Sequence, residues 1–155
     1  MRLVENAQLK MGEQDIAQIR FDPKSRDDIP QILRGLQYIY TSPEIREEVF
    51  STLEKMIPEK TNKKNGRPGM QLWKVFVLGV LRLNLNHDYD RIHDLANNHK
   101  TIRQMLGHGL IDDETEYNLQ TVKDNVSLLT PEILDRINEI VVKSGHRLVK
   151  KKRKI

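Results

Sequence analysis

Apolar residues recur every three to four positions along most of the chain, which is the spacing of an amphipathic helix. Two such helices are predicted within residues 28–58. The first starts at Asp28, and the second starts at Ser42-Pro43 and stops at Pro58. A third segment, residues 70–85, is apolar on nearly every face. We therefore expect it to form a central helix around which the others pack.

After residue 86 the apolar pattern continues in shorter pieces. Two short helices are predicted at residues 88–96 and 99–106, with Asn97-Asn98 between them. Gly107-His108-Gly109 follows the second helix with the permissive backbone chemistry that is common after a helix end. An acidic connector, residues 112–116, leads into the last third of the chain.

That last third carries one more apolar stripe, from Leu119 to Leu129, and a final helix. Thr130-Pro131-Glu132 offers this helix a cap, a first-turn proline and an acid, and Gly145 is predicted to close it. Residues 1–27 fit neither a helical nor a strand period. Because no alternating run is long enough for a sheet, the predicted fold is all-α. It is a compact helical bundle containing a helix-turn-helix-like unit, with a short irregular or β N-terminal arm.

The 155 residues suit one domain, which at this length buries roughly 68–70% of the surface of its unfolded chain. We divide the chain into an arm (1–27), a helical domain (28–145) and a basic tail (146–155). The lack of cysteine excludes disulfides and thiolate metal sites and suits a reducing cytoplasm. The first ten residues are too polar for a secretory signal. The longest apolar run, residues 75–81, is far shorter than the ~20 residues of a membrane span, so no membrane partner is predicted.

Positive charge is concentrated in two segments that contain no acid. The chain has a net charge of +4, yet residues 147–155 alone hold six basic residues, and residues 1–146 hold 20 basic against 22 acidic ones. The second segment, residues 60–74, holds five basic residues directly before the most apolar helix. Such segregation indicates a polyanionic partner, although terminal Lys/Arg runs are also common as solvated ends and linkers.

Residues 88–109 are the segment best suited to meet DNA. Two short helices joined by a tight polar turn, directly after a buried helix, are typical of a helix-turn-helix unit, although such pairs are also common as bundle corners. The inner face of the second helix is predicted to consist of Ile102, Met105 and Leu106, and its outer face of Lys100, Arg103 and Gln104. Long donor-rich side chains on the outer face suit base edges or phosphates. Asn98 is the predicted cap of this helix.

A series of short motifs in this region matches a known family. In chain order they are Gly66-Arg67-Pro68, a long apolar helix, Tyr89 and Ile92, and then Arg103, Met105, Leu106 and Gly107. The series resembles the N-terminal domain of bacterial insertion-sequence DDE transposases, with the ISNCY group as the nearest kin. The likeness extends from Met1 to about Lys152. Further along the chain that family has a Ser/Thr-rich segment, and its place is taken here by Thr121, Val122 and Asn125.

The resemblance implies that the chain binds double-stranded DNA at the terminal inverted repeats of an insertion sequence, in the bacterial cytoplasm, during transposition. In the family, strand cleavage belongs to a ribonuclease-H-like domain, whose three carboxylates hold two divalent metal ions. This chain ends where that domain is expected to begin. We therefore expect it to be no enzyme by itself, with no catalytic residue, no small-molecule substrate and no metal or other cofactor.

DNA contacts are assigned on this basis to three groups of residues. Base contacts are predicted for Lys100, Arg103 and Gln104. Phosphate contacts are predicted for Lys63, Lys64 and Arg67 of the loop, and for Lys150, Lys151, Lys152, Arg153 and Lys154 of the tail.

Other candidate sites have simpler explanations. The acids at residues 88–94 and 112–116 suit helix starts and a solvated connector better than a carboxylate triad, which needs a sheet. His87, His93 and His99 are spaced by six, which does not place them on one face of a helix, and no cysteine joins them, so a zinc site is not favoured. Trp73 is predicted to be a core residue. The rival function is a helical interaction module or truncated regulator of transposition with weak or non-specific DNA binding. If the chain has this rival function, the helices before Pro58 and the last helix would form a homo-oligomer surface.

Overall fold

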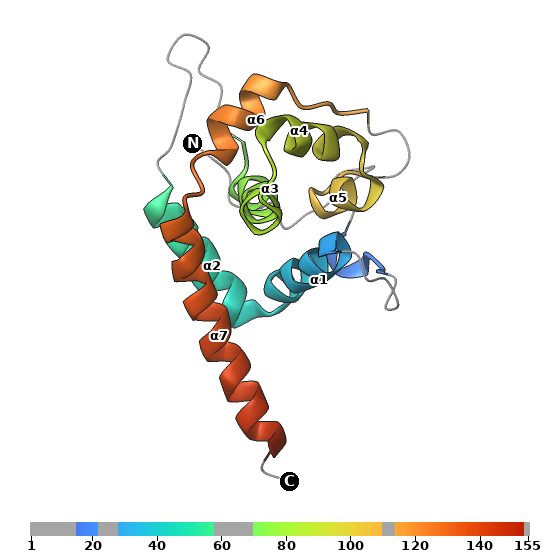
Figure 1. The fold of residues 1–155 in the computed structure, drawn as a ribbon. Helices are drawn as coiled ribbons and strands as arrows, with labels where there is room; N and C mark the ends of the chain where they lie inside the picture. The colour runs from blue at the N-terminus through green and yellow to red at the C-terminus, as the bar shows by residue number, and fades with distance from the viewer. Residues whose placement is uncertain (1–14, 22–27, 58–69, 110–113, 154–155) are drawn as a thin grey trace.

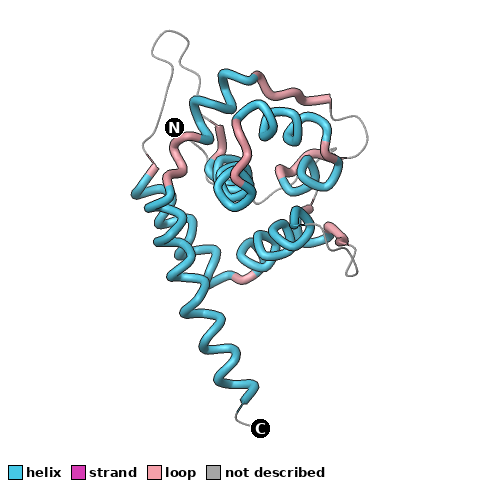
Figure 2. Tube along the Cα trace, viewed as in Figure 1, coloured by secondary structure: helices cyan, strands magenta, loops and turns pink. Residues whose placement is uncertain are grey.

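The computed structural model describes residues 15–21, 28–57, 70–109 and 114–153, with side chains described up to residue 143. This part of the chain contains seven α-helices, one short 3-10 helix (η1, Ile16–Gln18) and no strand (Figures 1 and 2). The α-helices are α1 (Asp28–Thr41), α2 (Pro43–Met56), α3 (Leu72–Leu85), α4 (Tyr89–Asn98), α5 (Lys100–Met105), α6 (Leu119–Val126) and α7 (Pro131–Arg153). The predicted all-α bundle is confirmed.

Helix α3 forms the centre of the bundle, as its all-round apolar sequence predicts. Every residue from Val75 to Leu81 is buried, and α3 contacts α1, α2, α4 and α6. Figure 1 shows α3 almost end-on, with α1 on one side of it and α4 and α6 on the other. The helix begins at Leu72 rather than Met70, and it ends where Asn86 adopts a left-handed backbone conformation with φ 53°.

The start of α3 is fixed by a buried amide on α6. The side-chain Oδ1 of Asn125 accepts a hydrogen bond of 3.1 Å from the backbone N–H of Met70, and its Nδ2 donates one of 2.8 Å to the carbonyl oxygen of Thr121. A buried backbone N–H without a partner is costly. Asn125 therefore fixes the point at which the chain enters the central helix.

The described part of the N-terminal arm is irregular and packs on α1. Ile16 and Ile19 are buried, and Gln37 of α1 donates from Nε2 to both of their carbonyl oxygens, at 2.9 and 2.8 Å. The Ile16 carbonyl oxygen also accepts from the Ile19 N–H within η1, and the two side-chain bonds attach the arm to α1. Residues 1–14 and 22–27 of the predicted arm lie outside the described residues.

Helices α2 and α7 lie side by side and run in opposite directions (Figure 1). Their contact is apolar: Val49 and Leu53 of α2 are buried, as is Ile137 of α7. Helix α7 has 23 residues against 14 in α2. Its C-terminal part therefore continues past the N-terminal end of α2 and away from the bundle. No helix in the described part of the chain combines the length and apolar character needed to cross a membrane.

Two predicted helix ends are wrong. Gly145 does not close α7, which continues to Arg153 and so includes most of the predicted tail. A glycine inside a helix costs only about 1 kcal/mol, and the basic residues that follow it favour the C-terminal end of the helix dipole. Asn98 does not cap α5, because it belongs to α4 and its Nδ2 donates to Asp94 Oδ1 at 2.8 Å. The cap is His99, the single residue between the two helices.

Candidate nucleic-acid interface

Helices α4 and α5 form a tight corner on the surface of the bundle. Asp88 caps α4 by accepting a hydrogen bond of 2.8 Å from the backbone N–H of Arg91. His99 caps α5 in the same manner: its ring Nδ1 accepts from the N–H of Ile102 at 3.2 Å. The predicted inner faces of both helices are confirmed as buried, namely Ile92, Leu95 and Ala96 in α4 and Ile102, Met105 and Leu106 around α5.

The corner is attached to the centre of the bundle through Trp73. The indole Nε1 of Trp73 donates a hydrogen bond of 2.8 Å to the carbonyl oxygen of Met105. The ring is only 5% exposed and packs against Tyr40, Phe50 and Phe76, with ring centroids 4.9 to 6.0 Å apart. Trp73 is thus a core residue, as predicted. Its polar atom fixes the end of α5 relative to α3.

The outer face of α5 is less open than its sequence predicts. Lys100 is exposed, but Arg103 and Gln104 are half-buried. Arg103 donates from Nη1 to the carbonyl oxygen of Ala96 at 3.1 Å, near the end of α4. The last carbonyl groups of a helix lack partners within the helix, which explains this bond. Helix α1 also contacts α5. Of the three predicted base contacts, Lys100 therefore has the most accessible side chain.

A polar cluster beside the corner was not predicted from the sequence. Asn97 holds Tyr117 with two backbone bonds: its Oδ1 accepts from the Tyr117 N–H at 2.7 Å, and its Nδ2 donates to the Tyr117 carbonyl oxygen at 3.0 Å. His93 Nε2 lies 2.8 Å from the same carbonyl oxygen, and the ring of buried His108 is hydrogen-bonded to the Tyr117 hydroxyl. These bonds join the connector before α6 to both sides of the corner.

The pKa of His99 is lowered from its usual value of 6.5, first by burial and then by the positive charge of Arg91, against an opposing contribution from a backbone hydrogen bond. The neutral ring is the form that can accept at Nδ1. The lowered pKa therefore matches the capping role.

The acids of the corner serve the local structure. Asp88 is the α4 cap, and Asp94 pairs with Arg91 at 3.1 Å while accepting from Asn98. The described residues include no group of three or more His, Cys, Asp or Glu side chains that could hold a metal ion.

The described side chains carry more negative than positive charge. There are 15 acidic and 12 basic residues in the part of the chain whose side chains are described, namely residues 15–21, 28–57, 70–109 and 114–143. Three of the basic side chains lie over aromatic rings: Arg46 over Tyr40 at 4.4 Å, Arg82 over Tyr89 at 4.7 Å and Lys74 over Tyr117 at 5.9 Å. The excess positive charge of the chain therefore comes from its remaining residues.

All eight predicted phosphate contacts fall among those remaining residues. Lys63, Lys64, Arg67 and Lys154 lie outside the described residues. For Lys150, Lys151, Lys152 and Arg153 the structure describes the backbone, as the last turns of α7, and not the side chains.

No family model matches this chain, and neither does any curated protein or any solved structure. The likeness to transposase N-terminal domains therefore depends on the series of residues named above.

Proposed function

We propose that this chain is a DNA-binding module, the N-terminal part of an insertion-sequence transposase that recognises the ends of its element. The observation that carries the proposal is the separation of charge between the bundle and the end of α7. The described side chains are acidic in balance, whereas residues 147–155 hold six basic residues and no acid. A polyanion is attracted to such a segment and not to the bundle as a whole.

Helix α7 would serve as a cationic arm. It is continuous from Pro131 to Arg153 and extends past α2. Arg147, Lys150 and Lys151 follow the i, i+3, i+4 spacing that shares one face of a helix. A helix presenting cations at this spacing suits the phosphate backbone, and such contacts are independent of base sequence. The loop residues Lys63, Lys64 and Arg67 would add phosphate contacts before α3.

Sequence preference would come from the α4–α5 corner. Lys100 is exposed at the start of α5, with Arg103 and Gln104 on the same helix. Trp73 and Arg103 hold the corner rigid through their bonds to Met105 and Ala96. A rigid support suits base recognition because contacts to base edges depend on accurate placement of the donor.

In this proposal the chain recognises DNA in the bacterial cytoplasm and does not cut it. Strand cleavage would belong to a ribonuclease-H-like domain with its own divalent metals. We accordingly expect the purified chain to leave supercoiled DNA intact in magnesium or manganese. Metal-dependent nicking would contradict this part of the proposal.

The salt dependence of duplex binding tests the proposal. Each neutralised phosphate contributes about −0.9 to the slope of log K against log salt. If the arm and the loop are engaged, we expect a slope of about −5 or steeper, and the K150Q/K151Q/K152Q variant should make it shallower by about 2.7. The matched control is K123Q, which removes one exposed lysine from α6 and should leave the slope unchanged. No duplex binding at low salt, or a flat slope, would favour the interaction module.

A further inference from the structure

Arg82, in the last turn of α3, has an unsatisfied polar atom inside the protein. Its Nε is the only buried side-chain nitrogen or oxygen without a hydrogen-bond partner in the described part of the chain. The side chain as a whole is half-buried. Its two Nη atoms make no hydrogen bond or ion pair with a described residue either, and they are not buried. A buried donor without an acceptor is costly and calls for a physical reason.

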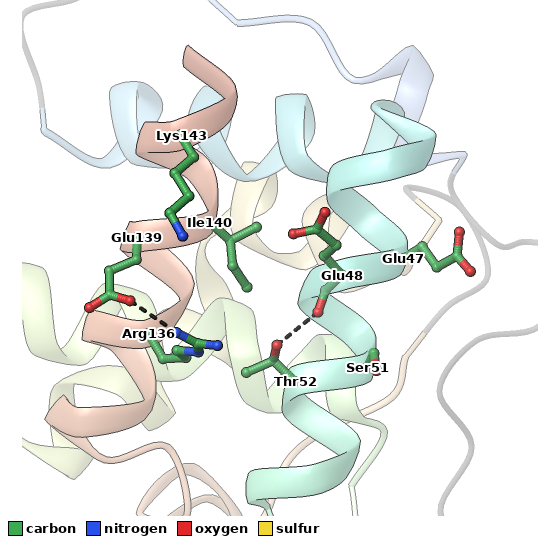
Figure 3. A pocket seen from close by; sticks show the side chains of 8 residues that line it. All are labelled: Glu47, Glu48, Ser51, Thr52, Arg136, Glu139, Ile140 and Lys143. Carbon is green, nitrogen blue, oxygen red and sulfur yellow. Dashed lines mark hydrogen bonds and ion pairs between the residues drawn. The ribbon is translucent and has the colours of Figure 1, made fainter. Parts of the chain in front are cut away.

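Other arginines of the bundle have polar partners. Arg136 lies in a groove of about 380 Å³ between α2 and α7 and forms an ion pair of 3.1 Å with Glu139 (Figure 3). Arg103 donates to the carbonyl oxygen of Ala96. Arg82 differs from both, because its positive charge is partly removed from water and no acid or carbonyl group compensates it.

The guanidinium of Arg82 is held in one place by the start of α4. Its Cζ lies 4.7 Å from the centroid of the ring of Tyr89, the first residue of that helix. The carbonyl oxygen of Arg82 accepts from the backbone N–H of Asn86 and from that of His87, the latter at 3.0 Å. These bonds close the turn between α3 and α4. The positive charge is therefore positioned before any ligand binds.

Acidic residues lie close in sequence but do not neutralise Arg82. Asp88 and Asp90, at the start of α4, are exposed, and neither forms an ion pair with it. The Asp88 carboxylate instead accepts from the backbone N–H of Arg91. The hydroxyl of Tyr89 has no hydrogen-bond partner among the described residues. The free donors of this site are therefore the two Nη groups and the Tyr89 hydroxyl.

We propose that Arg82 and Tyr89 form a binding site for a backbone phosphate of DNA. The two Nη groups of a guanidinium match the geometry of a phosphate and bind it with two parallel hydrogen bonds. Partial removal of the charge from water strengthens its attraction to an anion. The unpartnered Nε is then the cost of holding the Nη groups outward on the tyrosine ring. Local violations of this kind are expected at functional sites.

The position of the site suits the proposed function, on which this inference rests. Helix α4 joins the site to the corner, because it begins at Tyr89 and ends two residues before Lys100. Its ten residues span about 15 Å. The major groove of DNA is about 12 Å wide. Lys100 can thus reach into the groove while Arg82 contacts the backbone at its edge, as in helix-turn-helix proteins whose first helix crosses the backbone.

The R82M variant tests the proposal, because methionine keeps an unbranched apolar stem and removes the charge and the donors. In duplex binding, the slope of log K against log salt should become shallower by about 0.9, the contribution of one phosphate. The affinity at low salt should fall about tenfold or more. Without DNA, the melting temperature should equal that of the wild type or rise, since an unpartnered buried N–H and an unpaired charge are removed. If Arg82 served only the fold, the melting temperature would fall and the slope would stay unchanged.

Two controls accompany this variant. R20M removes an exposed arginine from the arm, outside the predicted DNA contacts, and should keep the slope and affinity of the wild type. Inorganic phosphate, added without DNA, tests for a site that takes a free anion. Circular dichroism checks the helix content of each variant. Should R82M fail to fold, R82K replaces it: lysine keeps the charge but offers a single point donor, so binding should weaken at least about threefold.

Four results would overturn the proposal while the wild type still binds DNA. They are a wild-type slope and affinity in R82M, an equal loss of slope in R20M, wild-type affinity in R82K, and stabilisation by inorganic phosphate that R82M loses while its DNA slope is unchanged. Each of these leaves the proposed function intact. A wild type that binds no duplex at low salt would instead overturn the proposed function, and this inference with it.

Discussion

The indole of Trp73, in the centre of the core, is hydrogen-bonded to the carbonyl oxygen of Met105, the last residue of α5, at 2.8 Å. The carbonyl groups in the last turn of a helix have no partner within it. In this protein the partner comes from the most buried helix of the bundle. The candidate interface is therefore fixed by the core and not only by its own short helices.

Replacing Trp73 by Phe should lower the free energy of unfolding by about 1–3 kcal/mol, because it leaves the Met105 carbonyl oxygen buried without its donor. The aromatic packing on Tyr40 and Phe50 is largely kept. Urea unfolding measures the change. Tyr38→Phe is the matched control: it removes a hydroxyl from a side chain that is 40% exposed, and should stay within about 0.5 kcal/mol of the wild type. Equal effects of the two changes would show that the indole bond contributes little.

Two glycines in helices should respond in opposite directions to alanine. A Cβ at Gly79 would lie 2.3 Å from Leu129 Cδ2 and 2.8 Å from Leu129 Cβ, so Gly79→Ala should destabilise the protein by about 1–3 kcal/mol through overpacking. Nothing lies within 4 Å of a Cβ at Gly35, which is exposed within α1. Gly35→Ala should therefore stabilise by about 0.5–1 kcal/mol. Thermal unfolding of both variants checks the signs, and a stabilising Gly79→Ala would contradict the close packing of α3 on the segment after α6.

His99 should make stability depend on pH. Its pKa is lowered in the folded state relative to the usual 6.5, so between these two values the unfolded chain binds more protons. The contribution of His99 is then fully present above about pH 6.5 and is lost as the pH falls through the lower, folded-state value. Protonation of Nδ1 also removes the acceptor for the Ile102 N–H.

His99→Asn provides the control, since asparagine is a good cap that does not titrate. Unfolding free energies of the wild type and His99→Asn should be compared at pH 7.5 and at pH 5. The wild type should lose stability relative to the variant on acidification. The same pH response in both proteins would show that His99 is not its source.

The sequence pattern predicts which faces of the helices are buried, because burial follows helical periodicity. The central position of α3 and the inward residues Ile102 and Met105 are both confirmed. Helix ends are harder to predict, because several residues compete for each cap. Asn98 is the better capping residue by type, but its amide is already bonded to Asp94, and His99 takes the role.

Side-chain contacts between distant segments carry no local pattern. Arg103 follows the spacing of an outward residue, yet it reaches back to the carbonyl oxygen of Ala96. Asn97 has the composition of a turn residue, whereas in the fold it lies in α4 and bonds to Tyr117, 20 positions away. The first outcome depends on how α4 and α5 meet at the corner and the second on where the connector packs, and neither follows from helical periodicity. The position of the two-helix corner along the chain was therefore predicted correctly, whereas the half-buried state of Arg103 and Gln104 was not, and DNA binding by the corner stays a prediction.

The corner and the arm should have separable effects on DNA binding. Lys100→Ala removes an exposed donor from the corner. The comparison uses a duplex that the wild type enriches from a random library and an unselected duplex. Lys100→Ala should reduce the difference in binding free energy between these two duplexes by about 1–3 kcal/mol. The K150Q/K151Q/K152Q variant should instead weaken binding to both duplexes alike, since phosphate contacts carry no base information.

Lys100 is the better choice for this test because changing Arg103 would also remove its bond to Ala96. Lys123→Ala, on α6, is the control. If Lys100→Ala weakens both duplexes equally, the corner attracts DNA without reading its sequence, and the recognition residues lie elsewhere in the chain.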